Sequence, residues 1–152
     1  MRVSQGHSTL PDPFAAVIEA TKDFTTAPDV LFVFCSTQQS PSQVHEALTT
    51  QFPGVPIAGC TTAGEQLGSI HTNGGIVVLA AQDTGVRWAV DVVHNLDQQT
   101  PESITEAVDA LVETAGIDHD DLKPDHAVCL LFVDGLRGQE ERLSEMLADA
   151  LQ

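Results

Sequence analysis

Residues 55–65 read VPIAGCTTAGE, a short apolar run followed by small, hydroxyl-bearing and glycine residues. The run 55–59 predicts a buried strand, and the residues after it predict a loop at the carboxyl end of that strand. Open α/β sheets usually bind their ligands at this end. The glycines let the backbone approach a bound group, and polar side chains come from Cys60, Thr61, Thr62 and Glu65. The stretch indicates either a ligand-binding loop or a tight turn that requires small residues.

Alternating helix and strand patterns surround this stretch. Helical spacing of apolar residues predicts helices over 11–25, 41–52, 101–116 and 139–151. Apolar runs predict further strands over 29–35, 76–82, 86–95 and 127–133, the middle two joined at Asp83-Thr84-Gly85 as a hairpin. Residues 66–74 predict a loop or short turn that carries His71. The resulting order is αβαβ, then ββ, then αβα, so we expect an α/β protein with a mixed sheet and helices packed on it.

The strand and helix after Pro28 have a counterpart after Pro124. With an offset of 98 residues, Val30 aligns with Val128, Phe34 with Phe132, and Ser36 with Asp134. Neighbouring parallel strands would place Ser36, Gly59–Thr62 and Asp134 on one rim of the sheet. Two plainer interpretations stay open: any α/β protein repeats strand, turn and helix, and Asp134 would equally serve as the cap of the helix that follows it.

A family resemblance emerges from three segments. Residues 52–65, FPGVPIAGCTTAGE, resemble the central signature of the FIST N domain, and the segments 30–48 and 130–136 with the following helix are similar to the same family. The resemblance implies a non-enzymatic, intracellular sensory domain that binds a small-molecule ligand, amino acids among them, and acts on a signalling output domain or protein. We expect ligand-binding residues at Gly59, Cys60, Thr61, Thr62, Gly64, Glu65, Ser36 and Asp134.

The resemblance also bears on completeness. Full-length FIST N domains share a further strand and a glycine-rich sequence at the point where this chain stops at Gln152. We therefore expect residues 1–152 to form a single FIST N-like domain that is truncated or minimal. A homodimer, or another partner chain, would be one way to supply the missing strand at the sheet edge.

Glu65 and Cys60 carry the sharpest chemical hypotheses. The Glu65 carboxylate is suited to hold the ammonium of an amino acid, while Thr61, Thr62 and free N–H groups take its carboxylate; alternatively, Glu65 caps local backbone N–H groups. Cys60 with His71 and Glu65 would in principle form the triad of a cysteine-dependent hydrolase or transferase. Some FIST proteins bind haem, and His71 would be the first candidate for an axial ligand. The histidines show no metal-binding spacing, so no metal is expected.

Composition limits the remaining function classes. The chain of 152 residues carries 22 acidic against 6 basic residues, a net charge of −16, which disfavours nucleic acid and anionic membranes as partners. No apolar run reaches the roughly 18 residues of a membrane helix, and the N-terminus lacks an apolar signal segment, so we expect a soluble cytoplasmic protein. The acidic, lysine-poor composition is typical of halophilic proteins. Of three cysteines, Cys35 and Cys129 are expected in the core, and Cys60 at the strand-to-loop junction.

Overall fold

The structure, a computed structural model, describes residues 1–118, 122–123 and 126–151. The chain divides into two compact units, residues 1–88 and 89–152. Each unit has a hydrophobic core of its own, and we describe the two separately.

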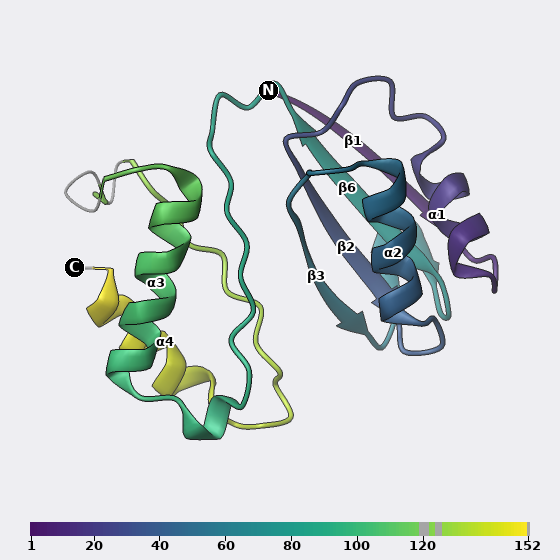
Figure 1. The fold of residues 1–152 in the computed structure, drawn as a ribbon. Helices are drawn as coiled ribbons and strands as arrows, with labels where there is room; N and C mark the ends of the chain where they lie inside the picture. The colour runs from purple at the N-terminus through teal and green to yellow at the C-terminus, as the bar shows by residue number, and fades with distance from the viewer. Residues whose placement is uncertain (119–121, 124–125, 152) are drawn as a thin grey trace. The chain divides into compact units, whose positions relative to one another are not determined.

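The first unit is built on a four-stranded mixed sheet (Figure 1). Its strand order is β1-β6-β2-β3, with β6 antiparallel to both of its neighbours and β2 parallel to β3. A separate hairpin, β4–β5, precedes β6. The bounds along the chain are β1 Arg2–Ser8, α1 Pro13–Thr21, β2 Val30–Ser36, α2 Pro41–Gln51, β3 Ile57–Thr62, β4 Glu65–Leu67, β5 Ile70–Thr72 and β6 Ile76–Gln82.

Helices α1 and α2 cover one face of this sheet (Figure 1). Alternate residues of a strand point to the same face, and the buried core takes Leu31 and Cys35 from β2 and Ile76, Val78 and Ala80 from β6. The helices contribute Val17 and Leu48, which are fully buried. Proline at the first turn of both helices fixes where they begin.

The predicted mixed sheet with packed helices is confirmed, but the first unit differs from the predicted order at three places, one of which is the β4–β5 hairpin where residues 66–74 predicted a loop or short turn. The sequence pattern did not predict β1, because RVSQGHS contains only one large apolar residue. Conversely, residues 86–95 form no strand, although a hairpin with β6 was predicted. Both neighbouring positions of β6 are taken, by β1 on one side and by β2 on the other, so no ladder position remains for residues 86–95.

The second unit contains a 3₁₀ turn, η1 Leu96–Gln98, and two helices, α3 Pro101–Ala115 and α4 Glu140–Ala150. Their buried apolar residues are Ile104, Val108 and Val112 from α3 and Leu143 and Met146 from α4. The bounds of α3 follow from local chemistry. Thr100 and Ser103 form a reciprocal capping box at its start, and Gly116 ends it with a φ of 63°.

The predicted strand at 127–133 is not present in the second unit. Neither sheet of the described residues includes this apolar run, so the proposed repeat of β2 is wrong at its strand. The prediction that Cys129 lies in the core is wrong for the same reason, since the residue is exposed, whereas Cys35 is buried as predicted.

Candidate functional site

The carboxyl ends of β2 and β3 lie side by side at one edge of the sheet. In the parallel register, Phe34 pairs with Cys60, Cys35 with Thr61, and Ser36 with Thr62. The start of β6 joins the same edge, because the Ser36 N–H donates to the Gly75 carbonyl at 2.9 Å. Two of the predicted site residues, Ser36 and Thr62, are thus brought together by the register of the strands.

Glu65 ties this edge together from within. Its side chain is only 2% exposed, an uncommon position for a carboxyl group. The Thr62 hydroxyl donates to Oε1 at 2.8 Å, and the Gly75 N–H donates to Oε2 at 3.1 Å. One carboxylate therefore connects the end of β3 to the start of β6. This geometry fits the alternative in which Glu65 caps local backbone and side-chain donors.

Gly59 is required for steric reasons, and Gly64 sits in a tight contact. A Cβ atom on Gly59 would overlap the Val33 carbonyl oxygen of the neighbouring strand. A Cβ atom on Gly64 would lie 3.0 Å from Asn73 Oδ1 and 3.1 Å from His71 Cε1. The small residues of VPIAGCTTAGE therefore allow β3 to approach β2 and the following loop to approach the β4–β5 hairpin.

The exposed residues of the stretch are Gly59, Cys60 and Thr61 of β3 and Ala63 just after it. Strand β3 is the last in its sheet within the part of the chain that the structure describes. The Leu31 N–H donates to the Pro56 carbonyl, which fixes the alternation along β3. Every second residue of β3 therefore bonds to β2. The residues between them, which include Gly59 and Thr61, present their backbone N–H and carbonyl groups at the outer edge of the sheet. This edge offers N–H donors and carbonyl acceptors next to the Thr61 hydroxyl.

The pattern of the sequence did not identify Gln39, a buried amide at the same end of the sheet. Gln39 is 5% exposed, and its Nε2 donates to the Leu10 carbonyl at 3.0 Å and to the Gly74 carbonyl at 3.1 Å. Ser36 is equally buried, and its hydroxyl accepts the Gln38 N–H at 3.2 Å. A glutamine in a polar loop is normally expected to be solvated, so the sequence did not predict that Gln39 would be buried and donate to two backbone carbonyls.

The proposed cysteine triad is not assembled. Cys60 is exposed, and no hydrogen bond joins it to His71 among the described residues. Glu65 is engaged with Thr62 and Gly75 rather than with a histidine. On the neighbouring strand, burial raises the pKa of the Cys35 thiol, and electrostatic repulsion from the Cys60 and Glu65 side chains adds to that effect. Cys35 is therefore held as a neutral thiol in the core.

His71, the first candidate for an axial haem ligand, lies on the β4–β5 hairpin, and haem binding there stays a prediction. The histidine is exposed on the three-residue strand β5 and does not line the cavity described below. Pockets for organic ligands enclose about 300–1,000 Å³, and a buried axial histidine would need to line one. The residues described contain no cluster of three or more His, Cys, Asp or Glu side chains that could hold a metal ion.

Asp134 belongs to the second unit. Its Oδ1 accepts the Leu136 N–H at 3.1 Å, and its Oδ2 lies 3.6 Å from Arg137 Nε. Helix α4 begins only at Glu140, with Gln139 as its N-cap. Asp134 thus caps a turn instead of the helix, and its place on a shared rim with Ser36 and Thr62 stays a prediction.

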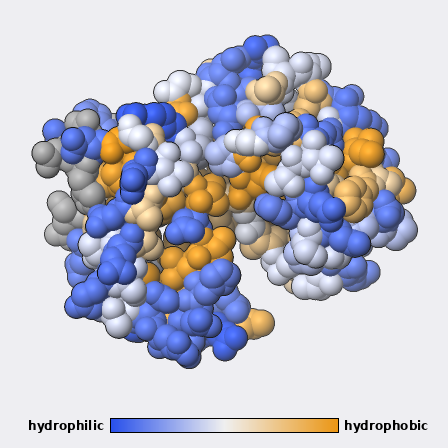
Figure 2. All heavy atoms as spheres, viewed as in Figure 1, coloured by the Kyte–Doolittle hydropathy of each residue, from blue (hydrophilic) through white to orange (hydrophobic). Residues whose placement is uncertain are grey.

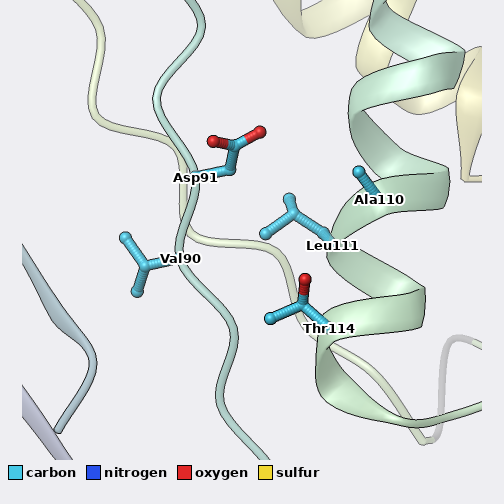
Figure 3. A pocket seen from close by; sticks show the side chains of 5 residues that line it. All are labelled: Val90, Asp91, Ala110, Leu111 and Thr114. Atoms are coloured by element: carbon cyan, nitrogen blue, oxygen red, sulfur yellow. The ribbon is translucent and has the colours of Figure 1, made fainter. Parts of the chain in front are cut away.

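A small open cavity lies in the second unit between residues 90–91 and α3 (Figure 3). Its volume is ≈ 170 Å³, and its lining consists of Val90, Asp91, Ala110, Leu111 and Thr114. The Asp91 side chain points toward α3, and Leu111 and Thr114 point toward the facing segment (Figure 3). Asp91 Oδ1 already accepts the Val92 N–H at 2.8 Å. None of the predicted site residues lines this cavity.

The comparisons with known proteins give one match. The family model described as the FIST N domain matches residues 29–152, which include α2, β2 to β6 and both helices of the second unit. Neither the curated proteins nor the solved structures contain a match to this chain. Across the described residues, every helix is too short or too polar to cross a membrane.

Proposed function

We propose that this chain senses a small ligand. It belongs to the FIST N domain family, a family of sensory and signalling domains, because the family model covers residues 29–152. In this proposal the domain binds a small polar ligand of the amino-acid class at the Gly59–Glu65 stretch. Binding is then communicated to a signalling output domain or protein. The observation that carries the proposal is the exposed edge at Gly59–Thr61, which the buried Glu65 holds in place.

The exposed edge has the hydrogen-bonding groups that an amino acid requires. A carboxylate accepts hydrogen bonds, for which the Thr61 hydroxyl and the outward backbone N–H groups are donors. An ammonium donates, for which the outward carbonyl groups of β3 are acceptors. A strand edge presents both kinds of group a few ångströms apart, so it can bind the two ends of one zwitterion. Cys60 and Gly64 flank this contact surface, and Ser36 and Thr62 support it from β2 and β3.

Glu65 supports the site in one of two ways. It contacts the ligand ammonium directly, or it acts as a positioning residue that fixes the end of β3. Its 2% exposure and its two existing hydrogen bonds favour the positioning role. The two roles differ in whether the negative charge is needed.

The ligand claim is tested by a thermal-shift screen of amino acids on the whole chain. A ligand present at 100 times its Kd stabilises the native state by about 2.7 kcal/mol, which gives a clear shift in Tm. We expect Thr61→Val to abolish the shift, because valine keeps the shape and strand propensity but lacks the hydroxyl. Thr50→Val, at an exposed threonine of α2, is the matched control and should retain the shift. A wild-type Tm that no amino acid changes would contradict the ligand class.

The role of Glu65 is tested by Glu65→Gln beside Glu65→Ala. A glutamine can accept the Gly75 N–H through Oε1 and donate through Nε2 to the Thr62 hydroxyl, which then donates to the Cys35 carbonyl. Positioning by Glu65 predicts nearly unchanged stability and affinity in Glu65→Gln. Glu65→Ala should lose about 1–3 kcal/mol, because two donors lose their partner. A Glu65→Gln variant that folds normally but binds at least about tenfold more weakly would assign the ammonium contact to the carboxylate.

A further inference from the structure

The negative charge of the molecule is concentrated in the second unit. Residues 89–152 carry 15 acidic and 3 basic residues, so their net charge is 3 minus 15, or −12. Residues 1–88 carry 7 acidic and 3 basic residues, a net charge of −4. The smaller unit therefore holds three quarters of the total of −16.

Helix α3 carries its acidic residues in a single stripe. Glu102, Glu106, Asp109 and Glu113 follow one another at spacings of four, three and four residues, and all four are exposed. Residues at these spacings are neighbours on a helix surface, with Cβ atoms about 5–6 Å apart, and like charges there repel. Helix α3 contains no lysine or arginine to separate them.

Helix α4 repeats the arrangement. Glu141, Glu145 and Asp149 are spaced by four residues and exposed, and no ion pair involves them among the described residues. The only basic residue of α4, Arg142, donates to the Leu96 and Gln99 carbonyls and to Gln139 Oε1 instead of to a carboxylate. In Figure 2, hydrophilic residues cover much of the surface over these helices.

The core that opposes this repulsion is small. Among the described residues of the second unit, the buried apolar side chains are Ile104, Val108, Val112, Leu143 and Met146, whereas the core beneath the sheet contains eleven. Folding free energies are small differences between large terms, so a modest repulsion is enough to open a unit with so few buried apolar contacts.

We propose that ionic strength controls the folding of the second unit: salt screens the α3 and α4 stripes and closes the helix pair, and low salt opens it while the sheet of the first unit stays folded. The Debye length falls from about 10 Å at 0.1 M salt to about 3 Å at 1 M. Only the shorter length lies below the spacing of the charges in each stripe. This inference is independent of the ligand proposed above, since it concerns neither β3 nor Glu65.

The test is hydrogen exchange with mass spectrometry on the whole chain, at about 0.1 M and about 2 M KCl. Amides of 101–115 and 140–150 should gain at least about tenfold protection at the higher salt concentration, and those of 30–36 and 76–82 should change less than about threefold. Potassium sulfate at equal ionic strength separates screening from salting-out, because salting-out favours sulfate and screening does not distinguish the two salts.

The decisive variant is Glu145→Lys, which places a cation between Glu141 and Asp149. It should give the helices at about 0.1 M KCl most of the protection that the wild type shows at about 2 M. Glu46→Lys, on α2 of the first unit, changes the net charge equally and should leave the helix exchange unchanged. The proposal is overturned if protection of 101–115 and 140–150 does not depend on KCl, if all four segments respond equally, or if Glu46→Lys matches Glu145→Lys.

Discussion

At the scale of single residues, Asp29 shows how one carboxylate fixes a chain reversal. The Asp29 Oδ2 accepts the Thr84 N–H at 2.8 Å and the Thr84 hydroxyl at 2.7 Å. Both bonds favour the charged form of the Asp29 carboxyl group and so lower its pKa. The Thr84 backbone N–H has the larger effect and the Thr84 hydroxyl the smaller one. The residues that predicted a hairpin, Asp83-Thr84-Gly85, are instead held against the start of β2, with positive φ at Asp83 and Gly85.

The lowered pKa of Asp29 gives a signed prediction for acid unfolding. Because its pKa is lower in the folded than in the unfolded chain, Asp29 stabilises the native state above the ordinary aspartate pKa of about 3.9. That contribution is lost as the pH falls through the lowered folded pKa. Asp29→Asn should therefore lower Tm at neutral pH, and the difference from the wild type should shrink in acid. A Tm difference that is constant from pH 7 to about pH 2 would show that Asp29 acts without its charge.

At the scale of elements, the pairing of β2 with β3 depends on Gly59. A methyl group at this position would overlap the Val33 carbonyl oxygen and push the parallel strands apart. Overpacking of this kind costs about 1–3 kcal/mol, so Gly59→Ala should lower Tm and increase exchange of the β3 amides. Gly135→Ala is the control, because the nearest atom to an added Cβ there is Glu140 Oε1 at 3.4 Å. Equal stability losses in the two variants would contradict the steric argument.

The strands show where sequence patterns are sufficient and where they fail. The segments that form β2 and β6 are nearly continuous runs of apolar residues, so hydropathy alone was sufficient to predict them as strands. Strand β1 is held through its backbone ladder to β6, and Gly6 allows α1 to cross it, features that hydropathy does not encode. Residues 86–95 have the right composition for a strand, but β1 occupies the ladder position. Pairing partners are a property of the sheet and are not contained in a local pattern.

In the candidate site, too, some features could be predicted from the sequence and others could not. The stretch Gly59–Glu65 could be predicted as a candidate from its small residues after an apolar run, although Gly59–Thr62 belong to β3 and not to the predicted loop. The roles within this stretch could not be predicted, since Glu65 becomes buried only when Gly75, ten residues later, supplies an N–H group. Gln39 lies in an unremarkable polar loop and gains its function from the Leu10 and Gly74 carbonyls. Each role depends on backbone groups distant in sequence.

At the scale of the whole molecule, the two separate cores predict that stability is divided between the units. Leu48 is fully buried beneath the sheet, and Leu143 is buried between α3 and α4. Truncating a buried leucine to alanine costs about 2–5 kcal/mol. Leu48→Ala should therefore raise amide exchange mainly in 30–36 and 76–82, and Leu143→Ala mainly in 101–115 and 140–150. If either substitution raised exchange to the same extent in all four segments, the chain would unfold as one cooperative body, and an amino acid bound at Gly59–Thr61 would then stabilise the helices as well as the sheet.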